Sequence, residues 1–585
     1  MYMKQKHFFA VTGLLLLSMI SYAQKKTANQ ANETIKTTVA QPLVADNTFI
    51  ASHTMYKVET RNLTHFATPQ VKMTNVKTAL VEQAKYNKET VFPQKLEPSV
   101  FISMEKKQAI ASILVPQYIQ YPNQSIEKII SYDLEITETP QAAQKTAGNR
   151  VYAANSALAS GNFYKIAISQ KGLYKIDYDF IKNNLGVNPS SFSSNNIRLY
   201  GNGGELLDEN NAVFRNDDLV ENAIQVFDGG DGQLNQGDYL LFYANGPHST
   251  MKDSLNKKFN HKYNIYSDVS HYFLNFDKGN GKRIALLPAL GNANVSVNSF
   301  NEFQFYEKDS VNLGRFGKTW WGDEFSDQPG RYLNRTFNFD IPNLDIATPV
   351  NIVTRYGAIS YTGTNIMTTG INGIALQNTV MGKTGPNYFE PVIVAVTQSE
   401  DVNLTSGNIV INSSFTKGSS NAVGYLDYIE INARRNLVFN GYLNFADWNS
   451  VGPSNTASYT IQNANANTQV WDITDPLIPV QMSTTLVGNT LTFIQEATSL
   501  HRFLAIDGSS FNTPTYVEKT NNQNLHAAAA TDYIIITHPS LKSEAEKLAN
   551  YHVSKRGLKT LIVTPQEIYN EFSSGSQDVS ALRDF

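Results

Sequence analysis

Two short apolar runs near the end of the sequence constrain the fold most, because the chain between them has the pattern of a helix. Tyr533 to Thr537 and Leu558 to Val563 have the continuous apolar character of strands in a parallel sheet with both faces buried. The stretch between them opens with Pro539 and ends at Gly557, and its apolar residues recur at helical spacing: Leu541, Ala545, Leu548 and His552. A strand, a crossover helix and a second strand predict a βαβ unit with parallel pairing.

The composition favours β-rich exported domains over helical bundles. Charged residues make up 17% and aromatic residues 11% of the chain, a balance that suits β-rich extracytoplasmic domains. A length of 585 residues predicts about four domains. The net charge of −3 gives no general attraction to nucleic acid or anionic lipid, so no nucleic-acid partner is expected. With no cysteine, these residues form no disulfide, thiolate metal site or thiol nucleophile.

The N-terminus has the pattern of a secretory signal peptide. Residues 1–23 carry two early lysines, an apolar stretch and a Ser-Tyr-Ala end, which predicts cleavage between Ala23 and Gln24. The apolar stretch is too short to span a membrane and no later stretch approaches twenty apolar residues, so we expect an exported chain without a transmembrane segment. Residues 24–48 contain few large apolar side chains, which predicts a flexible start.

Alternating apolar segments separated by turn residues predict several β-rich domains before the α/β end. The expected fold class is therefore mostly β N-terminal domains of sandwich or jelly-roll type, followed by the start of an α/β domain. Phe163–Ile168 and Gly172–Ile176 are expected to pair as a hairpin. The predicted divisions are 49–146 (β-rich accessory domain or prosegment), 147–160 (linker), 161–300 (α+β or β-rich), 301–435 (β-sandwich), 436–513 (small β domain), 514–530 (polar connector) and 531–585 (start of the α/β domain).

The last 55 residues resemble the opening of the gingipain-type (C25) cysteine peptidase domain. The resemblance rests on Ile536-Thr-His-Pro539, Arg556-Gly-Leu558, Ile568 to Gly575, and Gln577-Asp578 with Ala581 to Phe585. The positions that match the family motif are His538, Tyr569, Asn570, Glu571, Phe572, Gly575, Asp578, Arg583 and Asp584.

This resemblance implies a caspase-like α/β fold whose catalytic His and Cys follow later strands. Both are therefore expected beyond Phe585, and we interpret the chain as the front part of a longer protein, inactive by itself. The sheet that it begins is expected to have exposed edges and an unburied face.

The preceding part of the chain is similar to the N-terminal region of type IX secretion system sortases, C25 relatives of Bacteroidota. The stretches that carry this similarity are Phe163 to Gly186, Ile197 to Leu207, Asn216 to Pro247, Gly314-Arg315 with Trp320 to Phe325, Leu426 to Tyr428 with Arg434-Arg435, and Trp471 to Pro476. It implies a transpeptidase whose thiolate attacks the scissile carbonyl and whose thioester is resolved by an amine. The implied partners are cargo proteins with C-terminal sorting domains and other type IX secretion components, and the implied location is the periplasm or the outer-membrane cell surface.

Two other functions remain open from the sequence. A secreted gingipain-like endopeptidase would share the peptidase start. A non-catalytic adhesion or scaffold protein would share the export signal and the β-rich body, although it would leave the run from Tyr569 to Phe585 unexplained.

One acidic loop is the only candidate cofactor site in the sequence, and the cofactor that it would suit is calcium. Asp228, Asp231, Asn235 and Asp238 lie within eleven glycine-interrupted residues, and calcium prefers such clustered oxygen ligands. Because the loop lacks the spacing of an EF-hand and its bidentate Glu, an acidic β-turn is the preferred interpretation. Gly201 to Gly204 lacks the Lys and Ser or Thr of a phosphate loop and is interpreted as a turn.

Two further groups have a structural and a functional interpretation. His538 ends the first strand of the βαβ unit, the edge where parallel sheets place active sites, but the family's catalytic His lies on a later strand. We therefore expect His538 to set the turn into the helix. Four residues, Trp320, Trp321, Asp323 and Glu324, suit either a carbohydrate or peptide site or the packing of a β-domain.

Overall fold

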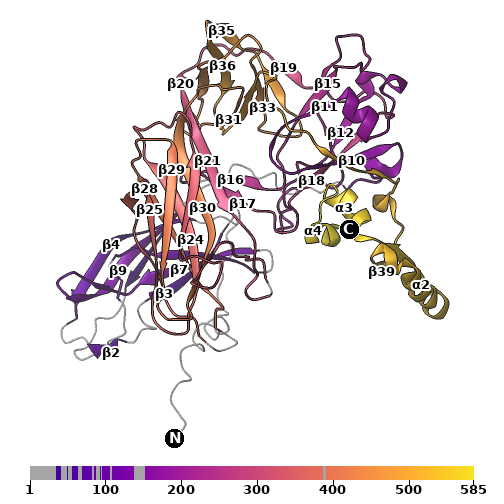
Figure 1. Ribbon diagram of the computed structural model, residues 1–585. Coiled ribbons are helices and arrows are strands. Elements are labelled where there is room, and N and C mark those ends of the chain that lie inside the picture. Colours follow the sequence, from indigo (N-terminus) through magenta and orange to yellow (C-terminus); the bar gives the residue numbers. More distant parts are fainter. Residues whose placement is uncertain are drawn as a thin grey trace. The chain divides into compact units, whose positions relative to one another are not determined.

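The computed structural model describes residues 34–40, 49–50, 56–63, 69–81, 85–86, 92–93, 95–105, 108–137, 152–315, 317–385 and 390–585 (Figure 1). The predicted signal peptide, with its cleavage site at Ala23 and Gln24, lies outside these residues. Contacts divide the chain into two compact units, Met1–Gly148 and Asn149–Phe585. The predicted fold class is confirmed, since most elements of the described residues are strands and their α-helices gather near the C-terminus. No helix in the described part of the chain is long and apolar enough to cross a membrane.

The first unit is built from two antiparallel sheets that share one apolar core. One sheet has β9 (Ile126–Thr137) between β1 (Thr34–Ala40) and β4 (Gln70–Leu80), and β8 (Tyr118–Gln120) also pairs with β9. The other has the order β3 (Tyr56–Asn62), β7 (Gln108–Pro116) and β6 (Ser99–Glu105), and β2 (Phe49–Ile50) forms a short parallel pair with β5 (Lys85–Tyr86). Alternate residues of β7 and β9 fill the core: Ala111, Ile113, Val115, Tyr132, Leu134 and Ile136.

Strand β1 corrects the expectation that residues 24–48 are flexible throughout. It pairs with β9 from Thr34 opposite Thr137 to Ala40 opposite Ser131. Its sequence, TIKTTVA, has few large apolar residues but is rich in β-branched ones, which favour strands. The low content of large apolar residues in 24–48 therefore did not reveal the strand.

The second unit begins with a five-stranded sheet that packs on a three-stranded one. The first sheet has the order β13 (Glu221–Asn222), β12 (Arg198–Tyr200), β18 (Ser270–Asn275), β10 (Phe163–Ile168) and β38 (Thr515–Thr520). The second has the order β11 (Gly172–Asp177), β15 (Tyr239–Ala244) and β14 (Gln225–Phe227). The core between them contains Ile166, Ile176, Phe180, Leu240, Phe242 and Leu274.

Two predictions fail in this domain. The expected hairpin of β10 and β11 does not form, because β10 pairs with β18 and β38 whereas β11 pairs with β15 in the other sheet. The expected polar connector 514–530 contains β38, which completes the sheet beside β10. Both errors have the same cause, because sequence patterns report which segments are extended but not which distant segment they pair with.

An antiparallel sandwich follows, and its strands run from Ser299 to Asn436. One sheet has the order β21 (Ser299–Glu307), β30 (Val423–Asn436), β24 (Val350–Ile359) and β28 (Val394–Val402), with β22 (Glu324–Phe325) on β30. The facing sheet has the order β23 (Asn334–Asp340), β29 (Asn408–Thr416), β25 (Asn365–Ile371) and β26 (Ile374–Ala375), with β27 (Thr379–Met381) on β25. The strands lie side by side in Figure 1, and their inner residues form one core. A hairpin of β16 (Ser249–Asp253) and β17 (Lys258–Lys262) precedes the sandwich.

The small β domain is a second sandwich, and it includes residues before 300. One sheet has the order β19 (Ala285–Leu287), β34 (Val480–Met482), β33 (Gln469–Asp472), β37 (Arg502–Ile506) and β31 (Tyr442–Ala446). The other has the order β20 (Val295–Val297), β32 (Thr456–Ile461), β36 (Thr490–Glu496) and β35 (Thr485–Val487). Strands β19 and β20 pair in parallel with β34 and β32, so residues 285–297 belong to this domain rather than to the predicted 161–300 domain.

The C-terminal segment forms the predicted βαβ unit. Parallel strands β39 (Tyr533–Ile536) and β40 (Thr560–Val563) are joined by helix α2 (Lys542–Arg556), and two short helices follow, α3 (Pro565–Phe572) and α4 (Val579–Asp584). Ala545, Ala549 and His552 form the buried face of α2, whereas Leu541 and Leu548 of the apolar series are exposed. Alternate residues of β39 are exposed as well, in agreement with the expected unburied sheet face.

We predict that the core of the small β domain depends on a cluster of aromatic rings. Phe503 is fully buried and contacts Tyr459 and Phe493 with ring centroids 4.9 and 5.0 Å apart. Phe503→Ala should lower the free energy of unfolding of this domain by about 3–5 kcal/mol, because the cavity left behind collapses only partly. Urea unfolding followed by circular dichroism measures the change. The control Val487→Ala, at a residue that is 73% exposed, should stay within about 0.5 kcal/mol.

Candidate functional site

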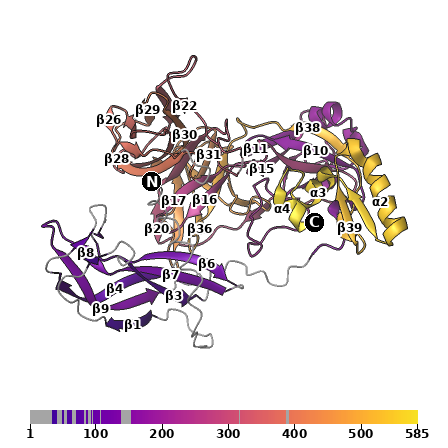
Figure 2. The same cartoon turned by 90° about the horizontal axis from the view of Figure 1, so that it is seen from below.

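The residues from Asn570 to Asp584, which we call the docking segment, hold the C-terminal segment against the domain of β10 and β18. Figure 2 shows α3 and α4 lying beside this domain, with α2 on their outer side. Most of the motif positions predicted from the sequence fall in this segment. The side chains of Asn570, Asp578 and Asp584 bond to residues about 370 to 405 positions earlier in the chain.

The centre of the contact is a buried lysine that the sequence analysis missed. Lys165, on β10, is 2% exposed, and its ammonium donates to Asn570 Oδ1 at 3.1 Å and to the carbonyl oxygen of Gly575 at 3.0 Å. Burial lowers the pKa of Lys165 to about 8, and the charge of Glu518 opposes this effect. Gly575 has φ 80°, and a Cβ there would lie 2.7 Å from the Lys165 side chain, so only glycine fits without displacing the lysine.

Serine hydroxyls extend this contact along β18. Ser574 Oγ donates to the carbonyl oxygen of His271 at 3.0 Å and accepts from the amide of Asn202 at 3.2 Å. Ser576 Oγ lies 3.2 Å from Nδ1 of His271. Burial and the nearby charge of Lys165 lower the pKa of His271 to about 3, so this imidazole is neutral. The glycine turn that contains Asn202 is therefore a docking turn rather than a phosphate site.

Three motif residues at the end of the docking segment bond to the loop before β13. Asp584 forms a forked ion pair with Arg215, which is 7% exposed. Asp578 accepts from the amide of Leu207 at 2.9 Å and caps α4 through the amide of Ser580. Arg583 donates to the carbonyl oxygen of Glu209 at 2.7 Å. These residue types match their contacts, because carboxylates accept from amides and guanidinium while arginine only donates.

Glu571 anchors the chain that follows β38. It is fully buried and accepts from the amides of Leu525 and His526, from Gln523 Nε2, and from Nδ1 of His526 at 2.6 Å. The pKa of Glu571 is lowered overall. Burial by itself would raise it, but these hydrogen bonds together have the larger effect. The pKa of His526 is raised overall. Burial by itself would lower it, but the bond to Glu571 and the charges of Asp217 and Asp218 together have the larger effect. Both pKa shifts favour the charged form of the pair, an imidazolium bound to a carboxylate.

This cluster also has the composition of a metal site. In the described part of the chain, Asp218, His526 and Glu571 bring ligand atoms within 4.8 Å of one another. However, Asp218 already accepts from Ala157 N and Ser156 Oγ, and the Glu571 oxygens are bonded as described. Hydrogen bonds and ion pairs within the cluster therefore account for the burial of its three residues.

The remaining motif residues have local roles. His538 caps the turn into α2, where its Nδ1 accepts from the amide of Ser540 at 3.2 Å. The carbonyl oxygen of Tyr569 accepts from the amides of Ser573 and Gly575 at 3.0 and 2.7 Å. The ring of Phe572 stacks on His526 with centroids 4.5 Å apart.

The acidic loop is bonded internally. Asp228 accepts from Ser194 Oγ and from the amide of Gly230, Asp231 accepts from Asn235 Nδ2 at 3.0 Å, and Asp238 accepts from the amide of Asn235 at 2.7 Å. These bonds account for the residues as an acidic turn. Calcium binding at this loop stays a prediction.

The aromatic and acidic group in the sandwich is divided between core and surface. Trp321 is 2% exposed and packs under Arg355, whereas Trp320 is 38% exposed. Asp323 accepts from the hydroxyl of Tyr306 at 2.6 Å and pairs with Arg335 at 3.0 Å, and Glu324 accepts from Ser326 Oγ at 2.6 Å. The structure therefore separates these four residues instead of joining them in one site.

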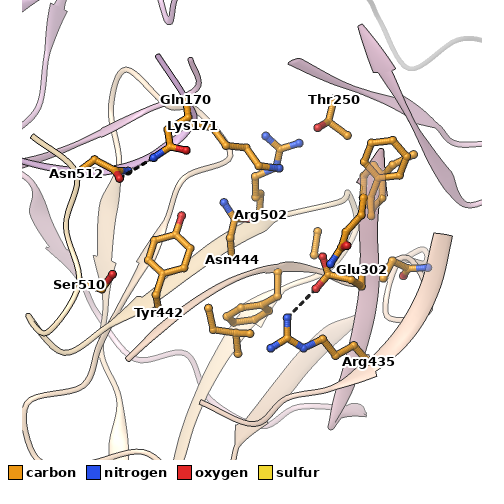
Figure 3. A pocket seen from close by; sticks show the side chains of 17 residues that line it. Gln170, Lys171, Thr250, Glu302, Arg435, Tyr442, Asn444, Arg502, Ser510 and Asn512 are labelled. Carbon is orange, nitrogen blue, oxygen red and sulfur yellow. Dashed lines mark hydrogen bonds and ion pairs between the residues drawn. The ribbon is translucent and has the colours of Figure 1, made fainter. Parts of the chain in front are cut away.

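A cavity of about 460 Å³ is lined by the first domain of the second unit, the hairpin of β16 and β17, the sandwich strands β21 and β30, and the small β domain (Figure 3). Its charged residues are Lys171, Arg435, Arg502 and Glu302. Arg435 pairs with Glu302 at 2.9 Å. The sequence gives no signal for this cavity, because its residues come from eight separate stretches of the chain.

Comparisons with known proteins identify the C-terminal segment. The sequence model of peptidase family C25 matches residues 526–585. The predicted resemblance to this family is confirmed. The match covers the docking segment, the βαβ unit and His526, which binds Glu571. No curated protein matches the chain significantly.

One solved structure shares the fold of most of the chain. The crystal structure of dimeric latent PorU from Porphyromonas gingivalis has a TM-score of 0.63 and 23% sequence identity, and the similarity covers 74% of this chain. This chain spans 40% of the length of that PorU chain, and the likeness shows the fold alone. The carbohydrate-binding module CBM36 in complex with calcium and xylotriose covers 22% of this chain at 17% identity, and its TM-score of 0.14 is too low to support an argument.

We predict that removing the Lys165 ammonium loosens the docking segment. Lys165→Met leaves the Asn570 and Gly575 oxygens buried without their donor, which costs about 1–3 kcal/mol for each group. Hydrogen exchange of residues 570–584 should become faster by at least tenfold, as measured by mass spectrometry. Lys519→Met, at an exposed lysine on the neighbouring strand β38, is the matched control. Equal exchange in both variants would contradict the assigned role of Lys165.

We also predict that the contact of His526 with Glu571 depends on pH in both directions. Glu571 has a lowered pKa, so its contribution is present above the unfolded value of 4.5 and is lost as the pH falls through the folded value. His526 has a raised pKa, so its contribution is complete below 6.5 and is lost as the pH rises through the folded value.

The amides of Leu525 and His526, which donate to Glu571, should therefore be best protected between about pH 4.5 and 6.5. Hydrogen exchange corrected for the intrinsic rate measures this protection. In His526→Gln the loss on the alkaline side should disappear. Protection that is independent of pH in the wild-type chain would contradict the ion pair.

Proposed function

We propose that this chain is the N-terminal portion of an exported cysteine peptidase that acts as a sortase of the type IX secretion system. It would cleave the C-terminal sorting domain from cargo proteins and attach the cargo to the cell surface. The match of residues 526–585 to peptidase family C25 is the observation that carries the proposal. The fold shared with latent PorU supports the sortase over other peptidases of this kind.

In this proposal the described residues form the body on which the peptidase domain begins. The contacts of Lys165, Glu571 and Arg215 fix the first βαβ unit of that domain to the β-rich body. The β-rich domains would then present cargo and contact other secretion components at the outer membrane. The chain has no cysteine, so its own residues supply the position of the peptidase domain rather than the nucleophile.

The test uses the product of the complete reading frame that contains this chain. It is incubated with a cargo protein that carries a C-terminal sorting domain and with glycinamide as the acceptor amine. We expect cleavage before the sorting domain, a cargo fragment whose mass includes glycinamide, and loss of both products after treatment with iodoacetamide. Mass spectrometry of the cargo fragment measures the outcome.

Two outcomes would overturn the sortase assignment. A fragment that ends only in a free carboxylate shows that water resolves the thioester, which is the reaction of a gingipain-like endopeptidase. No cleavage by a correctly folded product favours a non-catalytic adhesion or scaffold protein.

A further inference from the structure

Two cations in the cavity of Figure 3 have no ion-pair partner among the residues that the structure describes. Lys171 lies in the loop between β10 and β11, and Arg502 is the first residue of β37. In the described residues, no carboxylate oxygen lies within 4.0 Å of either cationic group. Both line the same cavity, and their side chains end near one another in Figure 3.

The two cations destabilise each other. Desolvation in the cavity and the charge of Arg502 lower the pKa of Lys171 to about 8, and the charge of Glu302 opposes this shift. The residue as a whole still keeps exposed surface. Because this pKa lies above neutrality, the ammonium form of Lys171 predominates at pH 7. Arg502 also contributes to the lowered pKa of Lys252 on β16. Like charges held this close raise the free energy of the empty cavity.

The acidic residues nearby compensate for only part of this charge. Glu302, the one carboxylate that lines the cavity, already pairs with Arg435 at 2.9 Å. Glu205 lies within the electrostatic range of Arg502, but it accepts from Asn245 Nδ2 at 2.8 Å, and burial raises its pKa. The excess positive charge therefore remains available to a ligand.

The rest of the cavity suits an organic molecule. Tyr442, Asn444 and Ser510 provide polar groups, and Phe259 and Phe303 provide apolar surface. In Figure 3 the side chains of Tyr442 and Asn444 lie on the same side of the cavity as Arg502. A volume of about 460 Å³ is in the range of pockets that bind small molecules.

We propose that this cavity binds a small organic anion whose oxyanion lies between Lys171 and Arg502. Carboxylate and phosphate groups share the required chemistry, since each accepts a forked pair of hydrogen bonds from a guanidinium and a further one from an ammonium. The polar body of the ligand would contact Tyr442 and Asn444. None of the residues that line this cavity belongs to the docking segment. The test of this proposal is therefore independent of the peptidase assignment.

Isothermal titration calorimetry of the 585-residue chain tests the proposal, with citrate and inorganic phosphate as probes at low ionic strength. We expect one site for at least one probe, with an affinity that falls as sodium chloride is added. Binding of citrate alone identifies a carboxylate ligand, and binding of phosphate alone identifies a phosphorylated one. Either result supports the oxyanion site.

Variants locate the binding in the cavity. Arg502→Gln and Lys171→Gln should each weaken binding by about tenfold or more, because each removes a charge-assisted contact. Lys171 has an exposed side chain, so its variant should fold even if the Arg502 variant does not. Lys555→Gln, at an exposed lysine on α2, is the control and should bind like the wild type. Absence of binding by both probes, or equal binding by wild type and Lys171→Gln, would overturn the proposal.

Discussion

The arrangement of the C-terminal segment depends on one buried charge, the ammonium of Lys165. A charge removed from water must be solvated by the protein, and here Asn570 and Gly575 supply the oxygens. The other contacts of the docking segment keep these two oxygens beside the lysine. Gly575 leaves space for the lysine, Ser574 and Ser576 bind His271 beside it, and the network of Glu571 holds α3 in position.

The same region joins the beginning and the end of the second unit. Strand β10 pairs with β38, which follows the two sandwiches, so the five-stranded sheet closes only after more than 300 residues of intervening chain. Contacts of such long sequence separation form slowly. The sheet against which the docking segment packs is therefore complete only when Thr515–Thr520 has paired with β10.

Local patterns predicted the elements of this chain, whereas pairing between distant segments was not accessible from them. The alternation along β24, β29 and β30 indicated a sandwich, and the spacing from Tyr533 to Val563 indicated the βαβ unit. The partners of β10 and the strand at 515–520 depend on contacts across hundreds of residues. Motif resemblance found Asn570, Glu571 and Asp584, but Lys165, Arg215 and His526 carry no local signal. The cavity of Lys171 and Arg502 was missed for the same reason.

The central claim is that the motif residues of the docking segment act through specific partners in the β-rich body. A double-mutant cycle on the ion pair of Arg215 and Asp584 tests it most directly, with Arg215→Met, Asp584→Asn and the double variant compared by urea unfolding of the C-terminal segment. The account predicts a coupling free energy of about 1–3 kcal/mol, because the pair is buried and forked. A coupling free energy near zero would contradict the account.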